Sequence, residues 1–219
     1  SFNEMPPVDE MALVSAAGAS GAPYFTTVQD AQHRDVDVLT LYPLDLVSVD
    51  ERFGGWMTQY AYANSITQSK LLEMAEVKDG AVHLGGRQFT TLTIAFEPFP
   101  SARLLDLIRQ LAEGGGRVIW AGPPPVLSRE GVPILAEWMN LFGVDYAPGL
   151  DEGRIASGMQ VEFEGLLAGI GPQMILTHFL VDHIYPVTPL EGVQSVARMR
   201  NQTVGTYKTA PHGGSLTFL

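Results

Sequence analysis

Residues 91–121 read TLTIAFEPFPSARLLDLIRQLAEGGGRVIWA and contain two strand signals on either side of one helix signal. The segment Thr91–Phe96 is rich in β-branched and aromatic residues, which is typical of a strand. Ser101 is suited to cap a helix over Ala102–Glu113, where leucines recur on one face and three glycines follow. Arg117–Ala121 then has the composition of a second strand. The order strand, helix, strand predicts two parallel strands joined by a crossover helix.

The flanking sequence extends this pattern in both directions. Val36–Tyr42 predicts a further strand of the same parallel sheet, and helices are expected near 58–76 and 130–142. A short hairpin is expected over 81–89, around two adjacent glycines. The sequence therefore predicts an α/β fold, with a parallel sheet flanked by helices.

The pattern of polar and apolar residues changes after residue 149. Val161–Gly165 alternates between polar and apolar residues, Ile175–Val187 is a long mixed run, and residues 150–219 contain few helical signals, which indicates mostly antiparallel strands. We therefore expect an α/β domain over 1–149. Residues 150–219 are expected to form a β-rich extension of the same sheet or a small packed subdomain.

Composition excludes several classes of function. The chain carries 24 acidic and 13 basic residues, a formal net charge of −11, and no cysteine. Nucleic acids and anionic membranes are bound through clustered Lys and Arg, so neither is expected as a partner. Without cysteine the chain can form no disulfide, thiolate metal site or cysteine nucleophile. No apolar run reaches the roughly 20 residues that span a bilayer, and the first residues do not have the pattern of a signal peptide. The compartment stays open.

Several of these segments together resemble one known family. The closest matches are the Asp-Gly before a buried strand and the Gly-Gly-Arg-Val-Ile step after a leucine-rich helix. The matching stretches are Asp37–Pro43, Val77–Gly80, Phe89–Ile94, Leu104–Gly122 and, more loosely, Gly213–Leu219. They resemble the glutamine-amidotransferase-like domain attached to glycoside hydrolases, best known from family 42 β-galactosidases, where it helps to trimerise the enzyme.

The resemblance implies a flavodoxin-like sheet and a catalytic barrel elsewhere in a larger parent protein. Amidotransferases use a cysteine on a tight turn between a strand and a helix. Here the corresponding stretch, Trp120–Pro125, has neither a cysteine nor a hydroxyl residue, and its three prolines prevent a helix from following directly. We therefore expect no amidotransferase activity.

Two carboxylates are candidates for chemistry at the sheet. Asp45 and Glu97 each follow a predicted parallel strand, and such sheets bind ligands beyond the carboxyl ends of their strands. A converging pair would suit general acid–base or glycosidic chemistry. The alternative is that Asp45 caps a turn and that Glu97 faces solvent or caps a helix.

Aromatic residues gather shortly after the first strand. Trp56, Tyr60 and Tyr62 lie near amide side chains, a combination that suits the apolar faces and hydroxyl edges of sugars. The same residues could instead form a buried helix face or a contact with another subunit. Both readings stay open, and a partner surface centred on Trp56 is the expectation for an accessory domain.

A polar cluster occurs late in the chain, at His178, Asp182 and His183. Zinc sites use such side chains, but no further ligand is evident nearby, so pairing on a half-exposed strand is the alternative. We expect no metal and no cofactor.

Two functions follow from these observations. The first is a non-catalytic domain of a larger glycoside-hydrolase-like protein, which serves in assembly or in shaping a carbohydrate site. Its partners would be the remainder of its own parent chain or sister subunits, and its strand-like last segment and non-Met first residue favour a piece of a longer protein. The second is a small carbohydrate-acting hydrolase that uses Asp45, Glu97 or the polar cluster around His178.

Overall fold

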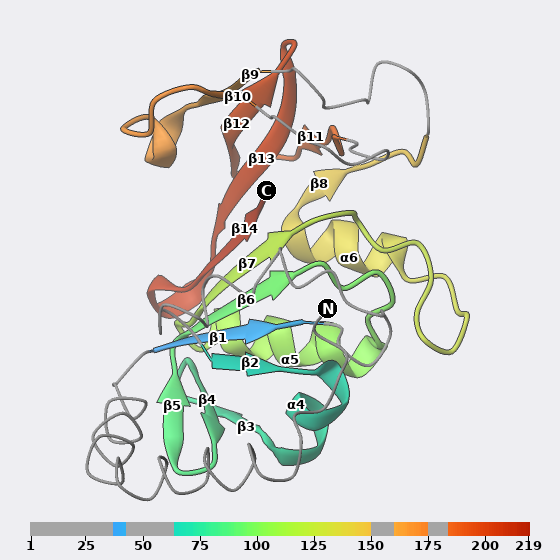
Figure 1. The fold of residues 1–219 in the computed structure, drawn as a ribbon, viewed down its shortest axis with the longest axis vertical. Coiled ribbons are helices and arrows are strands. Elements are labelled where there is room, and N and C mark those ends of the chain that lie inside the picture. The colour runs from blue at the N-terminus through green and yellow to red at the C-terminus, as the bar shows by residue number, and fades with distance from the viewer. Residues whose placement is uncertain (1–36, 43–63, 150–159, 175–183) are drawn as a thin grey trace, which may run out of the picture. The chain divides into compact units, whose positions relative to one another are not determined.

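The computed structural model describes residues 37–42, 64–149, 160–174 and 184–219. Contacts within the chain separate residues 1–36 from a compact unit formed by 37–219, and all described residues belong to that second unit. Its main feature is a mixed sheet in which nine described strands are joined, with two smaller sheets beside it (Figure 1).

One half of the main sheet is parallel. Its strands follow the order β2-β1-β6-β7-β14, and every neighbouring pair runs in the same direction. The bounds are β1 Val38–Leu41, β2 Asn64–Ile66, β6 Thr91–Ala95, β7 Arg117–Ala121 and β14 Ser215–Phe218. In register, Leu39 pairs with Leu92, and Leu92 pairs with Val118. The predicted parallel arrangement of the three strands that begin near residues 36, 91 and 117 is therefore confirmed.

The other half of the main sheet is antiparallel and comes from the C-terminal part of the chain. It adds the order β10-β9-β12-β13 beside β14, and Thr206 of β13 pairs with Phe218. The bounds are β9 Gln160–Phe163, β10 Gln173–Met174, β12 Val193–Met199 and β13 Gln202–Thr209. The β-rich region thus continues the same sheet, as the orange and red strands show in Figure 1. Two short strands, β8 Val144–Asp145 and β11 Thr188–Pro189, pair separately.

Three α-helices lie within the described ranges: α4 Gln68–Met74, α5 Ala102–Glu113 and α6 Leu135–Phe142. Single turns of 3-10 helix cover Gly165–Leu167 and Pro211–Gly213. The prediction for α5 is correct at both ends, and the Ser101 side chain accepts a hydrogen bond from the Leu104 N–H at 3.2 Å. None of these helices has the length and apolarity needed to cross a bilayer.

The predictions for the other two helices are partly wrong. The helix expected over 58–76 is wrong at Asn64–Ile66, which forms β2 against β1, and the described helix α4 begins only after the N-cap Thr67. Residues 58–63 lie outside the described ranges. The helix expected over 130–142 begins late, because Gly131 adopts a left-handed φ of 74° and residues up to 134 belong to a loop. The hairpin expected over 81–89 is present as β4 Ala81–Leu84 and β5 Arg87–Phe89, joined to β3 Glu76–Lys78.

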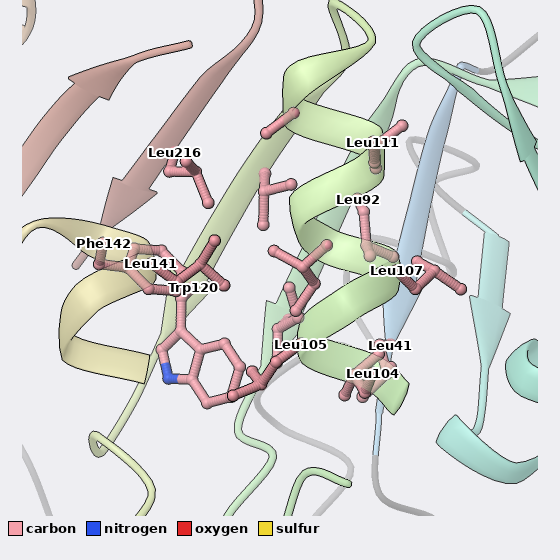
Figure 2. Packing of buried hydrophobic residues seen from close by; sticks show 14 of the residues in the cluster. Leu41, Leu92, Leu104, Leu105, Leu107, Leu111, Trp120, Leu141, Phe142 and Leu216 are labelled. Atoms are coloured by element: carbon pink, nitrogen blue, oxygen red, sulfur yellow. The ribbon is translucent and has the colours of Figure 1, made fainter. Parts of the chain in front are cut away.

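The core lies between one face of the parallel strands and helices α5 and α6. Figure 2 shows the leucines of α5 packed against Leu41, Leu92 and Trp120, with Leu141 and Phe142 of α6 beside Leu216. The α5 side chains that are buried are Leu104, Leu105, Leu107, Ile108, Leu111 and Ala112. Each fully buried leucine contributes about 2 kcal/mol, so burial of this face outweighs the intrinsic helix propensity of α5.

Aromatic rings fill the space between α6 and the sheet. The Trp138 ring stacks on Phe142 at a centroid distance of 4.8 Å and meets Phe218 edge to face at 5.2 Å. The Trp120 ring lies edge-on to Trp138 at 5.9 Å, and its Nε1–H donates to the carbonyl oxygen of Pro123 at 3.2 Å. These rings fix α6 over β7 and β14.

Four glycines allow close backbone packing at the amino edge of the parallel strands. A Cβ atom on Gly80 would lie 2.5 Å from the carbonyl oxygen of Gly114, and one on Gly116 would lie 2.6 Å from that of Gly80. A Cβ atom on Gly214 would overlap the carbonyl oxygen of Ala112. The turn after β3, the end of α5 and the start of β14 therefore meet mainly through backbone atoms, with the Leu111 side chain also against Gly116. We call Gly80, Gly114, Gly116 and Gly214 the glycine cluster.

Lys208 joins the antiparallel half to α6. Its Nζ donates to the carbonyl oxygens of Leu141 at 2.8 Å and Asn140 at 3.3 Å, at the helix end where carbonyls lack partners. Burial lowers the pKa of Lys208, while the carboxylate of Glu113 acts to raise it. The Lys208 side chain is thus partly buried, and from β13 it provides hydrogen bonds to carbonyl groups at the end of α6.

We predict that Gly214→Ala lowers the free energy of unfolding by about 3 kcal/mol or more, because the new methyl group has to displace the backbone of α5. The matched control is Gly169→Ala, at an exposed glycine with open space around the position of its Cβ atom. That change should leave stability unchanged or raise it by up to about 1 kcal/mol. Urea unfolding monitored by tryptophan fluorescence measures both. Equal effects of the two substitutions would contradict the packing described for the glycine cluster.

Candidate functional site

The carboxyl ends of three parallel strands lie at one edge of the sheet. β2, β1, β6 and β7 are adjacent and parallel, so the segments that follow β2, β6 and β7 leave the sheet on the same side. These segments are the start of α4, the loop 96–100 and the loop 122–134. Open α/β sheets bind their ligands at this edge. Among the described residues, a functional site is therefore expected at this edge.

Gln68, the first residue of α4, ties two of these segments together. Its side chain is only 1% exposed. Its Nε2–H donates to the carbonyl oxygen of Phe99 at 3.3 Å, and its Oε1 accepts from the backbone N–H of Ser101 at 2.6 Å. A buried amide that both donates and accepts in this way holds the start of α4 against the start of α5.

Glu97 is a buried carboxylate beside an arginine. The residue is fully buried, and its Oε1 accepts from the backbone N–H of Phe99 at 3.4 Å. Its Oε2 lies 3.8 Å from Nη2 of Arg129, whose Nη1–H donates to Oγ of Ser69 at 3.2 Å. Buried charges of this kind persist when they are paired, because removing one partner leaves the other uncompensated. We call Gln68, Ser69, Glu97, Ser101 and Arg129 the carboxyl-edge cluster.

The backbone at the ends of β6 and β7 is unusual. Phe96 has a φ of 73° and Gly122 a φ of 119°. For a bulky residue such as Phe96 the left-handed region costs about 1 kcal/mol or more, and strain of this kind is often found at functional sites. The N–H of Phe96 nevertheless donates to the carbonyl oxygen of Ala121 at 2.9 Å, which holds the two strand ends together. The strained residue is the immediate neighbour of Glu97.

The loop 122–134 carries the arginine of the cluster and is organised by Ser128. The Oγ atom of Ser128 accepts from the backbone N–H groups of Glu130 at 3.2 Å and Val132 at 3.3 Å. The Ser128 side chain, followed by a backbone hydrogen bond of Glu130 itself, lowers the pKa of the exposed Glu130 carboxyl. The loop therefore has a defined internal conformation.

The structure tests the sequence candidates only in part. Glu97 lies at the carboxyl edge as expected, but the alternative that it faces solvent or caps a helix is wrong, because it is buried and Ser101 caps α5. Asp45 lies outside the described residues, so its convergence with Glu97 stays a prediction. The remaining candidates also lie outside the described ranges: Trp56, Tyr60, Tyr62, His178, Asp182 and His183.

Three members of the cluster, Gln68, Ser69 and Arg129, were missed by sequence reasoning. Gln68 directly follows the N-cap Thr67, and Arg129 is the only basic residue between Gly122 and Ile134. A single arginine in an apolar, proline-rich loop is a signal that could have been noticed. The ion-pair partner of this arginine could not be predicted from the sequence, because Glu97 is distant in sequence.

Other features of the described residues offer less chemistry. A shallow hollow of about 280 Å³ lies between α4, β3 and α5, where Arg103 donates from Nη2 to the carbonyl oxygen of Leu72 at 3.4 Å. In the part of the chain that the structure describes, no three His, Asp or Glu side chains come together as metal ligands would. The carboxyl-edge cluster is therefore the candidate site.

Comparison with known proteins shows a shared fold. No protein-family model matches the chain, and no curated protein matches it. Among solved structures, Gan42B, a GH42 β-galactosidase from G. stearothermophilus, matches with a TM-score of 0.56 at 10% identity over 85% of this chain and 27% of its own. The β-galactosidase from Bacillus circulans sp. alkalophilus gives 0.57 and 10% over 84% and 28%.

A third match is a shorter protein. Cytoplasmic Protein STM1381 from Salmonella typhimurium LT2 matches with a TM-score of 0.56 at 10% identity, over 83% of this chain and 86% of its own. This chain thus spans little more than a quarter of the length of the two β-galactosidases, and most of the length of the Salmonella protein. At these identities the likeness concerns the fold alone.

We predict that Gln68→Leu lowers the free energy of unfolding by about 2 kcal/mol. The change is close in volume but leaves the Ser101 N–H and the Phe99 carbonyl without this partner. Gln110→Leu, on the exposed side of α5, is the control and should change stability by less than about 0.5 kcal/mol. Thermal and urea unfolding compare the two variants. If Gln68→Leu were as stable as the control, the amide would not be joining α4 to α5.

Proposed function

We propose that this chain is a non-catalytic, glutamine-amidotransferase-like domain of a larger glycoside-hydrolase-like protein, which serves in assembly or in shaping a carbohydrate site. One observation carries the proposal: the fold matches most of this chain to only about a quarter of each GH42 β-galactosidase. A domain that occupies so small a part of an enzyme leaves most of that chain for other parts, among which the catalytic one can lie.

The strand order supports a flavodoxin-like sheet as the finer description of the fold. The parallel strands follow the order β2-β1-β6-β7-β14, which in sequence order is 2-1-3-4-5. This is the order of flavodoxin-like sheets, in which the ligand crevice lies where the direction of winding reverses. Here the reversal falls between β1 and β6, beside the loop that contains Glu97.

The chemistry at the strand ends supports the absence of catalysis. An amidotransferase needs a cysteine nucleophile, and the chain has none. β7 ends in Gly122 followed by three prolines, a turn without a nucleophilic side chain. A general acid must reach its substrate, whereas Glu97 is fully buried beside Arg129. These residues are suited to holding loops in place.

The proposed partners are the remainder of a parent chain or sister subunits. Carbohydrate is the proposed ligand, bound at a site that this domain helps to shape. Trp56, Tyr60 and Tyr62 are the proposed contact residues, because aromatic side chains contribute much of the free energy of protein association. The segment after β1 is therefore the proposed partner surface.

We predict that the isolated chain hydrolyses no member of a panel of aryl glycosides above the buffer rate, because Glu97, the candidate carboxylate that lies among the described residues, is buried. Release of nitrophenol at several pH values measures this, with a GH42 β-galactosidase as the positive control. Turnover that is lost in Glu97→Gln or Asp45→Asn would instead establish the alternative, a small carbohydrate-acting hydrolase that uses these carboxylates.

We also predict that the purified chain self-associates, or binds the catalytic part of its parent protein, through the region of Trp56. Light scattering over a range of protein concentrations measures the mass, and Trp56→Ser should shift the protein towards the monomer. Trp138→Phe, a change in the core, is the control and should leave the mass unchanged. A strictly monomeric protein whose Trp56 is shielded from solvent quenchers would refute this proposal.

A further inference from the structure

The loop 122–134 is held together by its own hydrogen bonds. The N–H of Ser128 donates to the carbonyl oxygen of Val132 at 2.8 Å, and the N–H of Ile134 donates to that of Val126 at 3.1 Å. Leu127 and Pro133 form an isolated antiparallel bridge between these two bonds. Residues 126–133, which we call the loop tip, therefore form a small closed unit.

Apolar burial contributes little to holding the loop tip in place. Val126, Leu127 and Val132 are 47%, 40% and 58% exposed. Within the tip, Ser128 is the buried residue, and its hydroxyl oxygen accepts hydrogen bonds from backbone N–H groups of the tip. The flanking residues Pro124, Pro125 and Ile134 are buried and anchor both ends.

Arg129 connects the loop tip to the rest of the molecule. Its guanidinium lies 3.8 Å from the Glu97 carboxylate and donates to Ser69 of α4 at 3.2 Å. The arginine side chain is 22% exposed, whereas the Glu97 side chain beneath it is fully shielded from solvent. One side chain of the tip thus reaches two other segments of the carboxyl edge.

We propose that Arg129 is a latch that holds the loop tip closed over Glu97, and that the tip opens as a local unit while the sheet stays folded. Segments with few buried apolar contacts open at a lower free energy than the core, and a charge pair then determines how often they open. In the closed state the edge presents Val126, Leu127 and Val132, and in the open state it presents the Glu97 carboxylate. The latch is independent of whether the chain is an accessory domain or an enzyme.

Amide hydrogen exchange in the unmodified protein provides the first test. Increasing concentrations of urea, below the unfolding transition, accelerate amides that exchange through global unfolding and leave those that exchange through local opening almost unchanged. We expect the amides of Ser128 and Ile134 to belong to the second class, and those of Leu92 and Val118 in β6 and β7 to the first. The same urea dependence at all four amides would overturn the proposal.

Matched arginine variants provide the second test. Arg129→Met should raise the exchange rates of Ser128 and Ile134 about tenfold or more, because Glu97 loses a charge partner, with little change at Leu92 and Val118. Arg103→Met, which removes a guanidinium from the outer side of α5, is the control and should leave all four rates unchanged. Equal increases at the loop tip and in the sheet would show a general loss of stability and would overturn the latch. Unchanged protection of the tip would also overturn it.

Glu97→Gln keeps the tip testable if Arg129→Met does not fold. Glutamine preserves the volume and removes the charge, so the same two amides should exchange faster than in the unmodified protein, by a smaller factor. Protection of the tip equal to that in the unmodified protein would show that the carboxylate does not hold Arg129, and the proposal would fail.

Discussion

The close approach of backbone atoms in the glycine cluster is the constraint on which the rest of this fold depends. Gly80 lies in the turn between β3 and β4, Gly114 and Gly116 follow α5, and Gly214 precedes β14. A side chain on any of these glycines would collide with the backbone of another segment, so contacts of main-chain atoms largely set the relative positions of the segments. The chain enters β7 and β14 directly from this point, and the Arg117–Ser215 pair begins their parallel register.

The two edges of the parallel strands are built on different principles. At the amino edge, the N–H of Ser215 donates to the carbonyl oxygen of Gly116, and backbone packing leaves little freedom. At the carboxyl edge, Gln68, Glu97 and Arg129 hold the segments through side-chain hydrogen bonds and charge. Loops held by a few polar side chains can change with fewer consequences for the core, which is why the chemistry of α/β proteins is concentrated at this edge.

Much of the α/β half could be predicted from local sequence, because its signals are local. The Ser101 cap, the leucine face of α5 and the glycines after it determine both ends of that helix. The strand Asn64–Ile66 could not be predicted, because three residues carry no periodicity and the strand exists through its pairing with β1.

In the candidate site, too, some features follow from local sequence and others depend on residues distant in the sequence. The position of Glu97 after β6 follows from the rule that loops at strand ends carry function. Its burial does not follow from that rule, because it depends on the distant residue Arg129 and on the left-handed turn at Phe96. The late start of α6 likewise depends on how the loop 122–134 folds back on itself, which Gly131 permits.

The place of β14 in the sheet has a consequence for synthesis on the ribosome. β14 separates the parallel from the antiparallel half, yet it follows every other described strand in the sequence. While the nascent chain emerges, β7 has an unpaired edge, and β13 lacks its neighbour on that side until β14 is released. Contacts between such distant segments form slowly, and open strand edges attract other chains. Nascent copies of this protein therefore pass through an interval in which they need protection from aggregation, and it ends when β14 inserts.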